Sequence, residues 1–433
     1  MPSTHQPRGP VVTAGVDLRR FYEAHPYQCT GTELASLIEG RRAVVGDPQR
    51  WLHLYFPDQP YREGLDALVV GCRNLEAARL AAGASRTRFL ALDHEETTLD
   101  QLDRLKQHYR LDNLDLMWLG PDQIPVLDRH FDLVFCPQGL PATLGPPEFL
   151  RMVRERLAGP GSLNLCVGGR HGGLGVRLLR QMLTAAGIDF EAADAATFRQ
   201  WVETLPPSHP FQAAAAELPE LNHDAGLLDA LRACEPAFSV VELQRLLETS
   251  GLRLQRFLCQ APYMPQCSGL AALPFAAATS GTAGWDCLAE AYALTELFRG
   301  NLRTHTLIAC RDDRPARSHA VNFAGHDWLC YKPIRNPGLE IQTDDLPAGG
   351  VARLRWDAHD DPGIFLIVDA NQARLFDAID GACSILEILE AGKPDTAAPE
   401  EFARAFFETL WRYDYAWFQI PSAAADNAET GSE

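Results

Sequence analysis

The sequence predicts an α/β fold built on a parallel β-sheet, followed by a smaller α+β region. From Leu65 onward, short apolar runs alternate with amphipathic stretches, a pattern typical of strands buried on both faces and joined by helices. After about residue 310 the chain instead becomes rich in strand and turn residues. With 433 residues the chain is too long for one ordinary hydrophobic core, so two or three domains are expected.

Four apolar runs predict the central strands of this sheet. They are LDALVVGC, RFLALD, FDLVFC and SLNLCV, at 65–72, 88–93, 131–136 and 162–167. After Asp93, Leu99, Leu102, Leu105 and Tyr109 recur at steps of three and four residues, which predicts a helix with one apolar face. Two more helices are predicted at 147–159 and 174–187, each ending on a glycine suited to a left-handed cap.

A further helix and strand follow these units. Ser239 and Glu242 form a capping-box pattern that opens the helix SVVELQRLLETSG, and LRLQRFLCQ then alternates as a strand does. The stretch 267–284, rich in small residues, predicts a loop before the helix WDCLAEAYALTELFRG. In the last third, GIFLIVD predicts a strand, and helices are expected at 371–391 and 399–413.

These patterns divide the chain into four parts. We expect an N-terminal cap at 1–64, the α/β domain at 65–266, an α+β domain at 285–420 and a disordered tail at 421–433. The aromatic cluster WRYDYAWF, Trp411 to Phe418, is expected in a core rather than around a ligand.

Composition excludes several functional classes. A formal charge of −18 argues against nucleic acid or an anionic membrane as partner, because phosphate binding needs concentrated Lys and Arg. The eleven cysteines are scattered and never spaced C-x-x-C, which favours reduced thiols and no metal site. The N-terminus lacks the apolar core of a signal peptide, and no run of about 18 apolar residues occurs. The sequence therefore predicts a soluble, cytoplasmic protein.

Two strand ends carry the candidate chemistry. Gly71 and Cys72 end the first strand, and Asp93 ends the second about twenty residues later. In this fold class a glycine turn lets the backbone approach a ligand, and an acidic residue accepts hydrogen bonds from ribose hydroxyls. A nicotinamide-dependent oxidoreductase would require G-x-G-x-x-G after the first strand, and the sequence lacks it.

Several segments, taken in their order, carry a family resemblance. They are FYEAHPY, LVVGC, FLALD, HFDLVFC, FSVVELQRLLETSGLRLQRFLCQAPYMPQC, AYALTELFRG, LFDAIDGACSILEIL and FFETLWRYDYAWF. Together they resemble a group of bacterial class I S-adenosylmethionine-dependent methyltransferases with an appended C-terminal domain. The resemblance implies a Rossmann-like methyltransferase domain, S-adenosylmethionine as cofactor, and methyl transfer to a small molecule or a peptide.

The resemblance also assigns site residues. Gly71 and Cys72 would line the methionine part of the cofactor, Asp93 the ribose, and Cys136 with Pro137 the position beside the transferring methyl group. The family's first motif continues G-C-G-T-G, whereas Arg73 follows Cys72 here, where its side chain would either crowd the cofactor or reach its carboxylate.

A second departure from the family concerns the adenine. Gly120 occupies the place where the family carries an Asp facing the adenine amino group, and Asp122, two residues away, would substitute.

A general base is not evident, because the loop CPQGLPATLGPP contains no titratable side chain. Candidates are Tyr22 and Tyr27 from the N-terminal cap and His171, beside Arg170, after the last of the four predicted strands. The alternative for Tyr22 and Tyr27 is that they only pack the lid, and the alternative for His171 is a solvent-exposed loop position without a catalytic role. Methyl transfer depends mainly on positioning, and a base helps only when the acceptor needs deprotonation.

Two functions therefore remain open. An active methyltransferase should have an open pocket beside Gly71, Asp93 and Cys136. In a catalytically inactive binding or regulatory partner, Arg73, Leu75 or Leu119 would fill that space. The segment 375–389, with its Asp380–Gly381 turn, resembles the winged-helix peptide-binding chaperone of pyrroloquinoline quinone biosynthesis. It predicts either peptide binding or a module that caps the first domain or forms a homodimer.

Overall fold

The computed structural model describes residues 48, 50–72, 76–141, 144–188, 194–217, 219–232, 236–270, 285–359 and 361–421. The chain divides into two compact units, one containing 174–234 and the other containing 29–173 and 235–433. Each unit is described by itself below.

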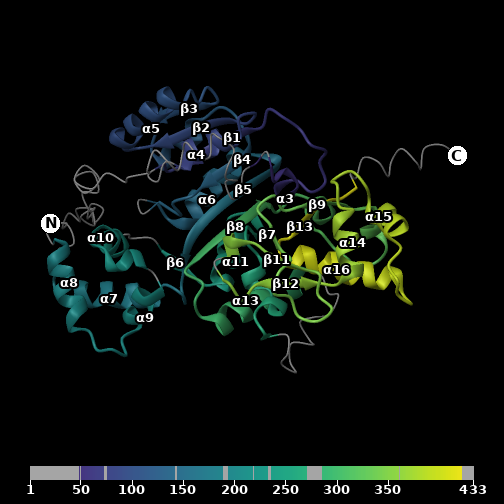
Figure 1. Ribbon diagram of the computed structural model, residues 1–433. Coiled ribbons are helices and arrows are strands. Elements are labelled where there is room, and N and C mark those ends of the chain that lie inside the picture. The colour runs from purple at the N-terminus through teal and green to yellow at the C-terminus, as the bar shows by residue number, and fades with distance from the viewer. Residues whose placement is uncertain are drawn as a thin grey trace, which may run out of the picture. The chain divides into compact units, whose positions relative to one another are not determined.

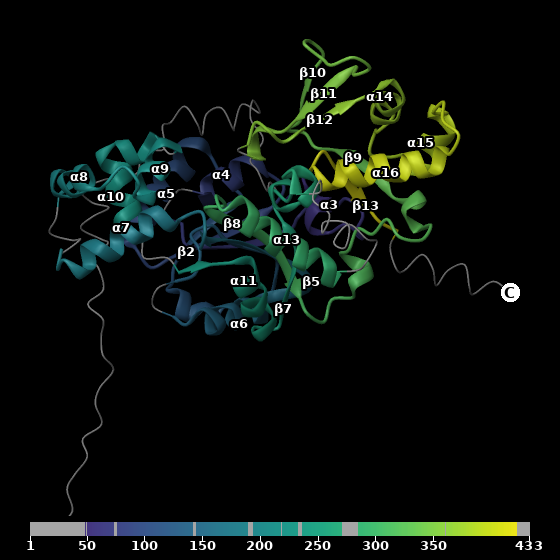
Figure 2. The same cartoon turned by 90° about the horizontal axis from the view of Figure 1, so that it is seen from below.

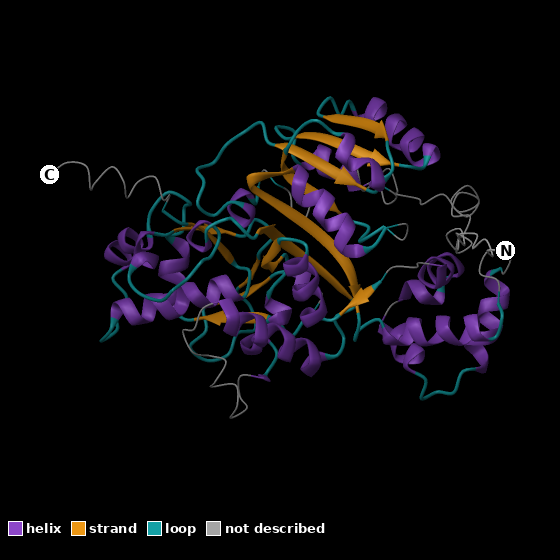
Figure 3. Ribbon diagram, turned by 180° about the vertical axis from the view of Figure 1, so that it is seen from behind, coloured by secondary structure: helices purple, strands orange, loops and turns teal. Residues whose placement is uncertain are grey.

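An eight-stranded sheet is the centre of the larger unit (Figures 1 and 3). Its path runs β3-β2-β1-β4-β5-β8-β7, and β6 pairs with β5 off this path. Strands β1 to β5 are parallel, whereas β8 is antiparallel to both of its neighbours. The strands are β1 Asp66–Val70, β2 Arg88–Asp93, β3 Leu114–Trp118, β4 Phe131–Cys136, β5 Leu157–Gly169, β6 Ala237–Phe238, β7 Leu252–Phe257 and β8 Thr304–Arg311.

The four predicted central strands are confirmed as β1, β2, β4 and the second half of β5. Strand β3 was not predicted, because this edge strand lacks a buried run: only Leu114 is buried, and Met117 and Trp118 are exposed. Strand β8 was not predicted either, and it lies within the range 285–420 expected for the C-terminal domain. The central sheet therefore continues well past residue 266.

Helices cover both faces of the sheet. Alternate residues of β1 enter different cores: Leu68 and Val70 join one, and Ala67 and Val69 the other. The first core is closed by α6, α11 and α13, and the second by α3, α4 and α5 together with the C-terminal region. These helices are α3 Leu52–Tyr55, α4 Glu76–Gly83, α5 Glu96–Tyr109, α6 Pro146–Arg156, α11 Val240–Thr249 and α13 Trp285–Arg299.

Helix ends follow the sequence patterns in one case and depart from them in another. The Ser239 side chain accepts a hydrogen bond from the Glu242 N–H, and the Glu242 carboxylate accepts one from the Ser239 N–H, so the predicted capping box is confirmed. The glycine cap predicted for the helix at 147–159 is wrong. There α6 ends at Arg156, and Gly159 lies inside β5 because the chain enters the strand directly.

In its described residues, the C-terminal region contains two small sheets and the α-helices α14, α15 and α16 (Figure 2). The predicted strand and helices are found, and Gly381, at φ +78°, forms the expected turn between α14 and α15. Side chains of this region, including Trp417 and Phe418, share one core with Ala67 and Phe135 of the central sheet. The elements are β9 Lys332–Arg335, β10 Glu340–Gln342, β11 Ala352–Arg355, β12 Phe365–Val368, α14 Ala370–Asp377, α15 Ile385–Gly392, α16 Pro399–Arg412 and β13 Ala416–Gln419.

The smaller unit is helical in its described part. Its helices are α7 Leu174–Ala185, α8 Ala195–Thr204, α9 Pro210–Glu217 and α10 Asp224–Arg232. They bury a core of their own that includes Leu179, Phe198 and Phe211. Gly187, at φ +76°, follows α7 in the left-handed conformation that the sequence predicted.

Across the described ranges, no helix combines the length and apolar character needed to cross a membrane.

Candidate cofactor site at the β1–β4 crevice

The strand order reverses between β1 and β4. From β1 the chain goes outward to β2 and β3 on one side, and β4 and β5 lie on the other side. Loops that leave neighbouring strands in opposite directions open a crevice at the carboxyl ends of those strands, where ligands of open α/β sheets bind. Gly71 follows β1, and Pro137 follows β4, at this edge.

Gly71 makes the turn that follows β1. It has φ +81°, a conformation that a residue with a side chain adopts only at a cost, and its N–H donates to the Leu92 carbonyl at 3.0 Å. A Cβ at this position would lie 3.4 Å from Oε1 of Gln138. The Gln138 side chain therefore comes across from the β4 loop to the end of β1. The sequence analysis missed this residue because an amide in a loop of prolines and glycines gives no distinctive signal.

Asp93 connects the loops after β1 and β2. Its Oδ2 accepts the Cys72 N–H at 2.8 Å, and its Oδ1 accepts the Glu95 N–H at 2.9 Å. Asp93 is only 6% exposed. Asp93 therefore holds both loops, and a carboxylate oxygen can accept more than one hydrogen bond.

Two of the predicted site residues are buried cysteines. Burial, followed by the nearby Asp93 charge, raises the pKa of the Cys72 thiol well above its usual value. Burial alone also raises the pKa of Cys136. Both thiols are therefore neutral at pH 7, and neither supplies a thiolate.

Trp118 extends the same edge of the sheet. It pairs in register with Asp93, and its Nε1–H donates to the His94 carbonyl at 2.9 Å. The residue is nevertheless 73% exposed. A large aromatic surface is thus held in place beside the acidic residue, and the sequence analysis missed it together with β3.

Gly120 and Asp122 follow β3 as the spacing predicted. Gly120 precedes the 3₁₀ helix Pro121–Val126, and its N–H donates to Oε1 of Gln123 at 3.0 Å. A Cβ on residue 120 would lie 2.5 Å from Oδ1 of Asp122. The exposed Asp122 carboxylate therefore occupies the space that an acidic side chain at position 120 would enter.

The remaining candidates are less centrally placed or lie outside the described residues. His171 lies beyond the far end of β5. Cys136, at the end of β4, pairs with Leu165, and β5 continues for four more residues, about 13 Å, before it ends at Gly169. The Arg170 Nε donates to Glu242 at 2.6 Å and thus binds the start of α11. Tyr22, Tyr27, Arg73 and Leu75 lie outside the described residues. Within the described ranges, no group of three or more His, Cys, Asp or Glu could hold a metal ion.

Solved structures are similar to this chain over most of its length. PKMT2 from Rickettsia typhi matches with a TM-score of 0.59 at 13% identity, over 87% of this chain and 76% of that one. PKMT2 in complex with AdoHcy gives a TM-score of 0.59 at 14% identity, over 88% and 76% of the two chains. No model of a known protein family matches the sequence. The sheet order, the single antiparallel strand β8 and this similarity show that the chain has the fold of class I S-adenosylmethionine-dependent methyltransferases.

Proposed function

We propose that this protein is an S-adenosylmethionine-dependent methyltransferase that acts on a basic protein or peptide. The observation that carries the proposal is the pair of hydrogen bonds by which Asp93 holds the turns after β1 and β2. They keep Gly71, with its φ of +81°, at the edge of the crevice. A backbone free of a Cβ is what close approach to a cofactor requires.

The residues at the crevice fit S-adenosylmethionine group by group. Asp93 retains acceptor sites for ribose hydroxyls, and the exposed Trp118 ring offers a face on which an adenine can stack. Asp122 provides a carboxylate for the adenine amino group. Gly71 and Gln138 border the position of the methionine part.

The chemistry supplied by the bound cofactor is a methyl group on a positively charged sulfur. An acceptor lone pair would take this methyl group, and the electrons of the carbon–sulfur bond would remain on sulfur. The protein's part is to hold the acceptor in line and to exclude water. The neutral thiols of Cys72 and Cys136 do not compete as nucleophiles, because burial keeps them protonated.

Two observations support a basic protein as the acceptor. PKMT2 from Rickettsia typhi is a protein lysine methyltransferase, and it matches 87% of this chain. The net charge of −18 attracts cationic chains and repels acidic ones. A lysine acceptor must first lose a proton, and no side chain at the described crevice is an evident base, so we propose that solvent takes this proton.

One observation favours the second candidate, a methyltransferase-like binding protein without activity. Both Asp93 oxygens already accept backbone N–H groups, and the side chain is almost buried. If the loop needs both bonds, Asp93 serves the fold alone.

Calorimetric titration with S-adenosylmethionine and S-adenosylhomocysteine separates the two candidates. Under the first, both ligands bind with micromolar affinity, and Trp118→Ala weakens binding at least tenfold whereas Trp118→Phe retains most of it. Incubation with a lysine-rich peptide and labelled cofactor should then transfer the label. If wild-type protein binds neither ligand, the enzyme proposal is wrong and the binding-protein candidate stands.

A further inference from the structure

A buried polar cluster lies at the edge of the sheet where β5, β6 and β7 end and β8 begins. Because β8 runs antiparallel to β5 and β7, its first residues lie beside their carboxyl ends. The cluster consists of Glu296 from α13, His305 from the start of β8 and Tyr263 from the loop after β7, residues 258–267. These three residues are 1%, 0% and 4% exposed. None of them belongs to the proposed cofactor site.

Both ring nitrogens of His305 are hydrogen-bonded. Nδ1 lies 2.7 Å from the Tyr263 hydroxyl oxygen, and Nε2 lies 3.0 Å from the Phe238 carbonyl oxygen at the end of β6. A carbonyl oxygen can only accept, so Nε2 must carry a proton. The imidazole therefore connects three segments that are far apart in the sequence, namely the loop after β7, the start of β8 and the end of β6.

The hydrogen bond between Tyr263 and His305 forms whether or not Nδ1 carries a proton. Burial, followed by the nearby Glu296 charge, raises the pKa of Tyr263 well above its usual value, so its hydroxyl keeps its proton. Toward a bare Nδ1 the hydroxyl donates. Toward a protonated Nδ1 it accepts, and its own proton can turn to the Thr304 carbonyl oxygen at 3.3 Å. The loop after β7 thus stays attached to β8 in either state of the imidazole.

Glu296 attaches the same cluster to α11. Its Oε2 accepts the Val240 N–H at 2.8 Å, and its Oε1 lies 3.3 Å from His305 Nε2. Val240 is the first residue of α11, where the helix dipole favours a carboxylate. Helices α11 and α13 and strand β8 therefore meet at one buried carboxyl group.

The Tyr263 ring is held independently of its hydroxyl. Its centroid is 3.6 Å from that of Phe257, with the ring planes 3° apart, and Tyr292 packs edge-on with its centroid at 6.0 Å. Removal of the hydroxyl would leave these ring contacts in place. The substitution Tyr263→Phe therefore isolates the hydrogen bond to His305.

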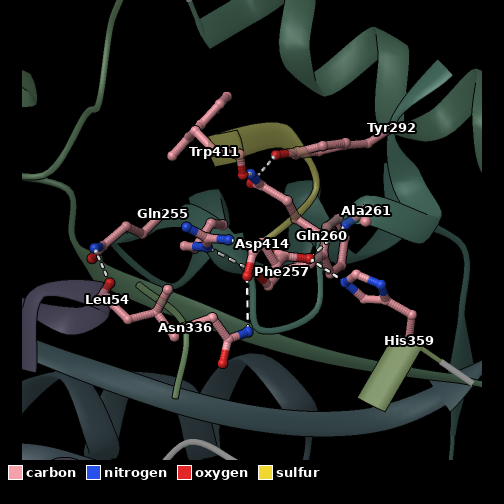
Figure 4. Close-up of polar contacts among 11 residues, drawn as sticks. Leu54, Gln255, Phe257, Gln260, Ala261, Tyr292, Asn336, His359, Trp411 and Asp414 are labelled. Atoms are coloured by element: carbon pink, nitrogen blue, oxygen red, sulfur yellow. Dashed lines mark hydrogen bonds and ion pairs between the residues drawn. The ribbon is translucent and has the colours of Figure 1, made fainter. Parts of the chain in front are cut away.

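The first residues of the loop after β7 are held separately, at the end of α16 (Figure 4). The Ala261 N–H donates to the Asp414 carboxylate at 2.9 Å, and Gln260 Nε2 donates to the Trp411 carbonyl oxygen at 2.8 Å. The loop is therefore attached at two places, near its start to the end of α16 and at Tyr263 to the start of β8.

The place of the cluster along the sheet edge relates it to the methyl acceptor. In the proposed cofactor site Trp118 ends β3, Asp93 ends β2 and Gly71 follows β1, so the adenine, ribose and methionine parts would run along this edge toward β4. The next strands in order are β5, β8 and β7. The methyl end of the cofactor would then point to the side of the edge where the loop after β7 and the start of β8 lie.

We propose that Tyr263 and His305 are positioning residues for the acceptor protein, because they hold the loop after β7 against β8 on the side from which the acceptor approaches. This inference rests on the proposed function. Both side chains are buried, so they act through the loop and not by touching the acceptor. A loop that is ordered before binding does not have to be ordered during binding, so the hydrogen bond should lower KM for the acceptor.

Steady-state kinetics of full-length wild type and Tyr263→Phe, with poly-lysine as acceptor and saturating labelled S-adenosylmethionine, test the proposal. We expect KM for poly-lysine to rise about fivefold, as the loss of one hydrogen bond allows. The value of kcat should stay within twofold, and the affinity for S-adenosylhomocysteine should not change. A folding defect alone would lower kcat through a smaller active fraction and would leave KM as it is.

Tyr415→Phe is the matched control. Tyr415 is also buried, and its hydroxyl donates to the Ile364 carbonyl oxygen at 3.3 Å within the C-terminal region. Its loss should lower the melting temperature about as much as Tyr263→Phe does and leave KM for poly-lysine unchanged. Hydrogen exchange of the wild type supplies a readout that needs no variant: the amides of 258–267 should be protected before poly-lysine is added and change little on binding.

Four results would overturn the positioning role in an active enzyme. They are an unchanged KM in folded Tyr263→Phe, an equal rise of KM in Tyr415→Phe, weaker binding of S-adenosylhomocysteine by Tyr263→Phe, and a loop at 258–267 that becomes protected only when poly-lysine binds. If the wild type binds no cofactor or methylates no lysine, the proposed function itself is wrong, and the positioning role falls with it.

Discussion

The Asp93 carboxylate accepts the backbone N–H of Cys72 at 2.8 Å, although the two residues are 21 positions apart in the sequence. The bond ties the loop after β1 to the loop after β2, and a second bond, from the Glu95 N–H, ties Asp93 to the start of α5. An acidic residue expected to bind ribose is thus also the residue that shapes the glycine turn.

Replacing Asp93 should therefore reduce stability as well as ligand binding. Asp93→Ala leaves two largely buried N–H groups without their acceptor, which we expect to lower the free energy of unfolding by about 1–3 kcal/mol. Urea denaturation monitored by circular dichroism measures the change. Asp122→Ala is the matched control: this exposed carboxylate is expected to change stability by less than about 0.5 kcal/mol. Equal midpoints for Asp93→Ala and wild type would show that the two bonds do not hold the loop.

Alanine substitutions at two glycines of β5, Gly169 and Gly159, should affect stability differently. Gly169 lies where β5 passes the segment before β8, and a Cβ there would overlap the Leu302 carbonyl oxygen. Gly169→Ala should destabilise the protein by about 1–3 kcal/mol, as overpacked sites do. At Gly159 a Cβ would meet nothing within 4 Å, so Gly159→Ala should be neutral or stabilise by up to about 1 kcal/mol. Measured side by side, the melting temperature should fall for Gly169→Ala and should stay unchanged or rise for Gly159→Ala. A loss of stability at Gly159 as large as at Gly169 would refute this argument.

The ion pair of Arg256 and Asp414 should be among the most sensitive contacts of the fold. Both side chains are buried, so Asp414→Ala leaves an unpaired cation in the interior, and we expect a loss of about 3–5 kcal/mol. The pair of Arg412 and Glu408 is the control, because it is partly exposed and Glu408→Ala should cost no more than about 1 kcal/mol. Chemical denaturation of both variants measures the difference. Equal losses of unfolding free energy for Asp414→Ala and Glu408→Ala would show that the buried ion pair matters no more to stability than the partly exposed one.

The sequence predicted the elements whose residues face a core on both sides. The runs at 88–93 and 131–136 match β2 and β4 to the residue, because continuous apolar sequence requires burial on both faces. Edge strand β3 was missed, since its exposed Met117 and Trp118 break that pattern. Strand β8 was missed for a different reason. Its place between β5 and β7 depends on pairing with residues far away in the sequence, and local patterns do not encode this.

The candidate site was predictable only in part, for related reasons. Gly71 and Asp93 follow strands that the pattern reveals, so their position at the sheet edge could be inferred. The hydrogen bond between Asp93 and Cys72, the approach of Gln138 to Gly71 and the fixed ring of Trp118 depend on side-chain geometry across three strands. Trp417, from the aromatic cluster that the sequence assigned to a core, does lie in a buried core.

Stability should fall as the pH decreases from about 6.5 toward 4.5, and His319 should be one cause. The folded protein lowers the pKa of His319 from 6.5 to about 3, chiefly by burial, so in this range the unfolded chain binds a proton that the folded chain does not. The contribution of neutral His319 to the free energy of unfolding is complete above its unfolded pKa of 6.5, and it is lost as the pH falls below that value. One proton gives a slope of at most about 1.4 kcal/mol per pH unit.

His319→Gln removes that proton and keeps a polar side chain of similar reach. The difference in unfolding free energy between wild type and His319→Gln should therefore shrink or reverse as the pH falls from 6.5 to 4.5, because carboxylates common to both proteins cancel. Urea titrations at a series of pH values give the two slopes. If wild type and His319→Gln lose stability in parallel, His319 takes up a proton in the folded protein as readily as in the unfolded chain, and it is not a cause of the loss.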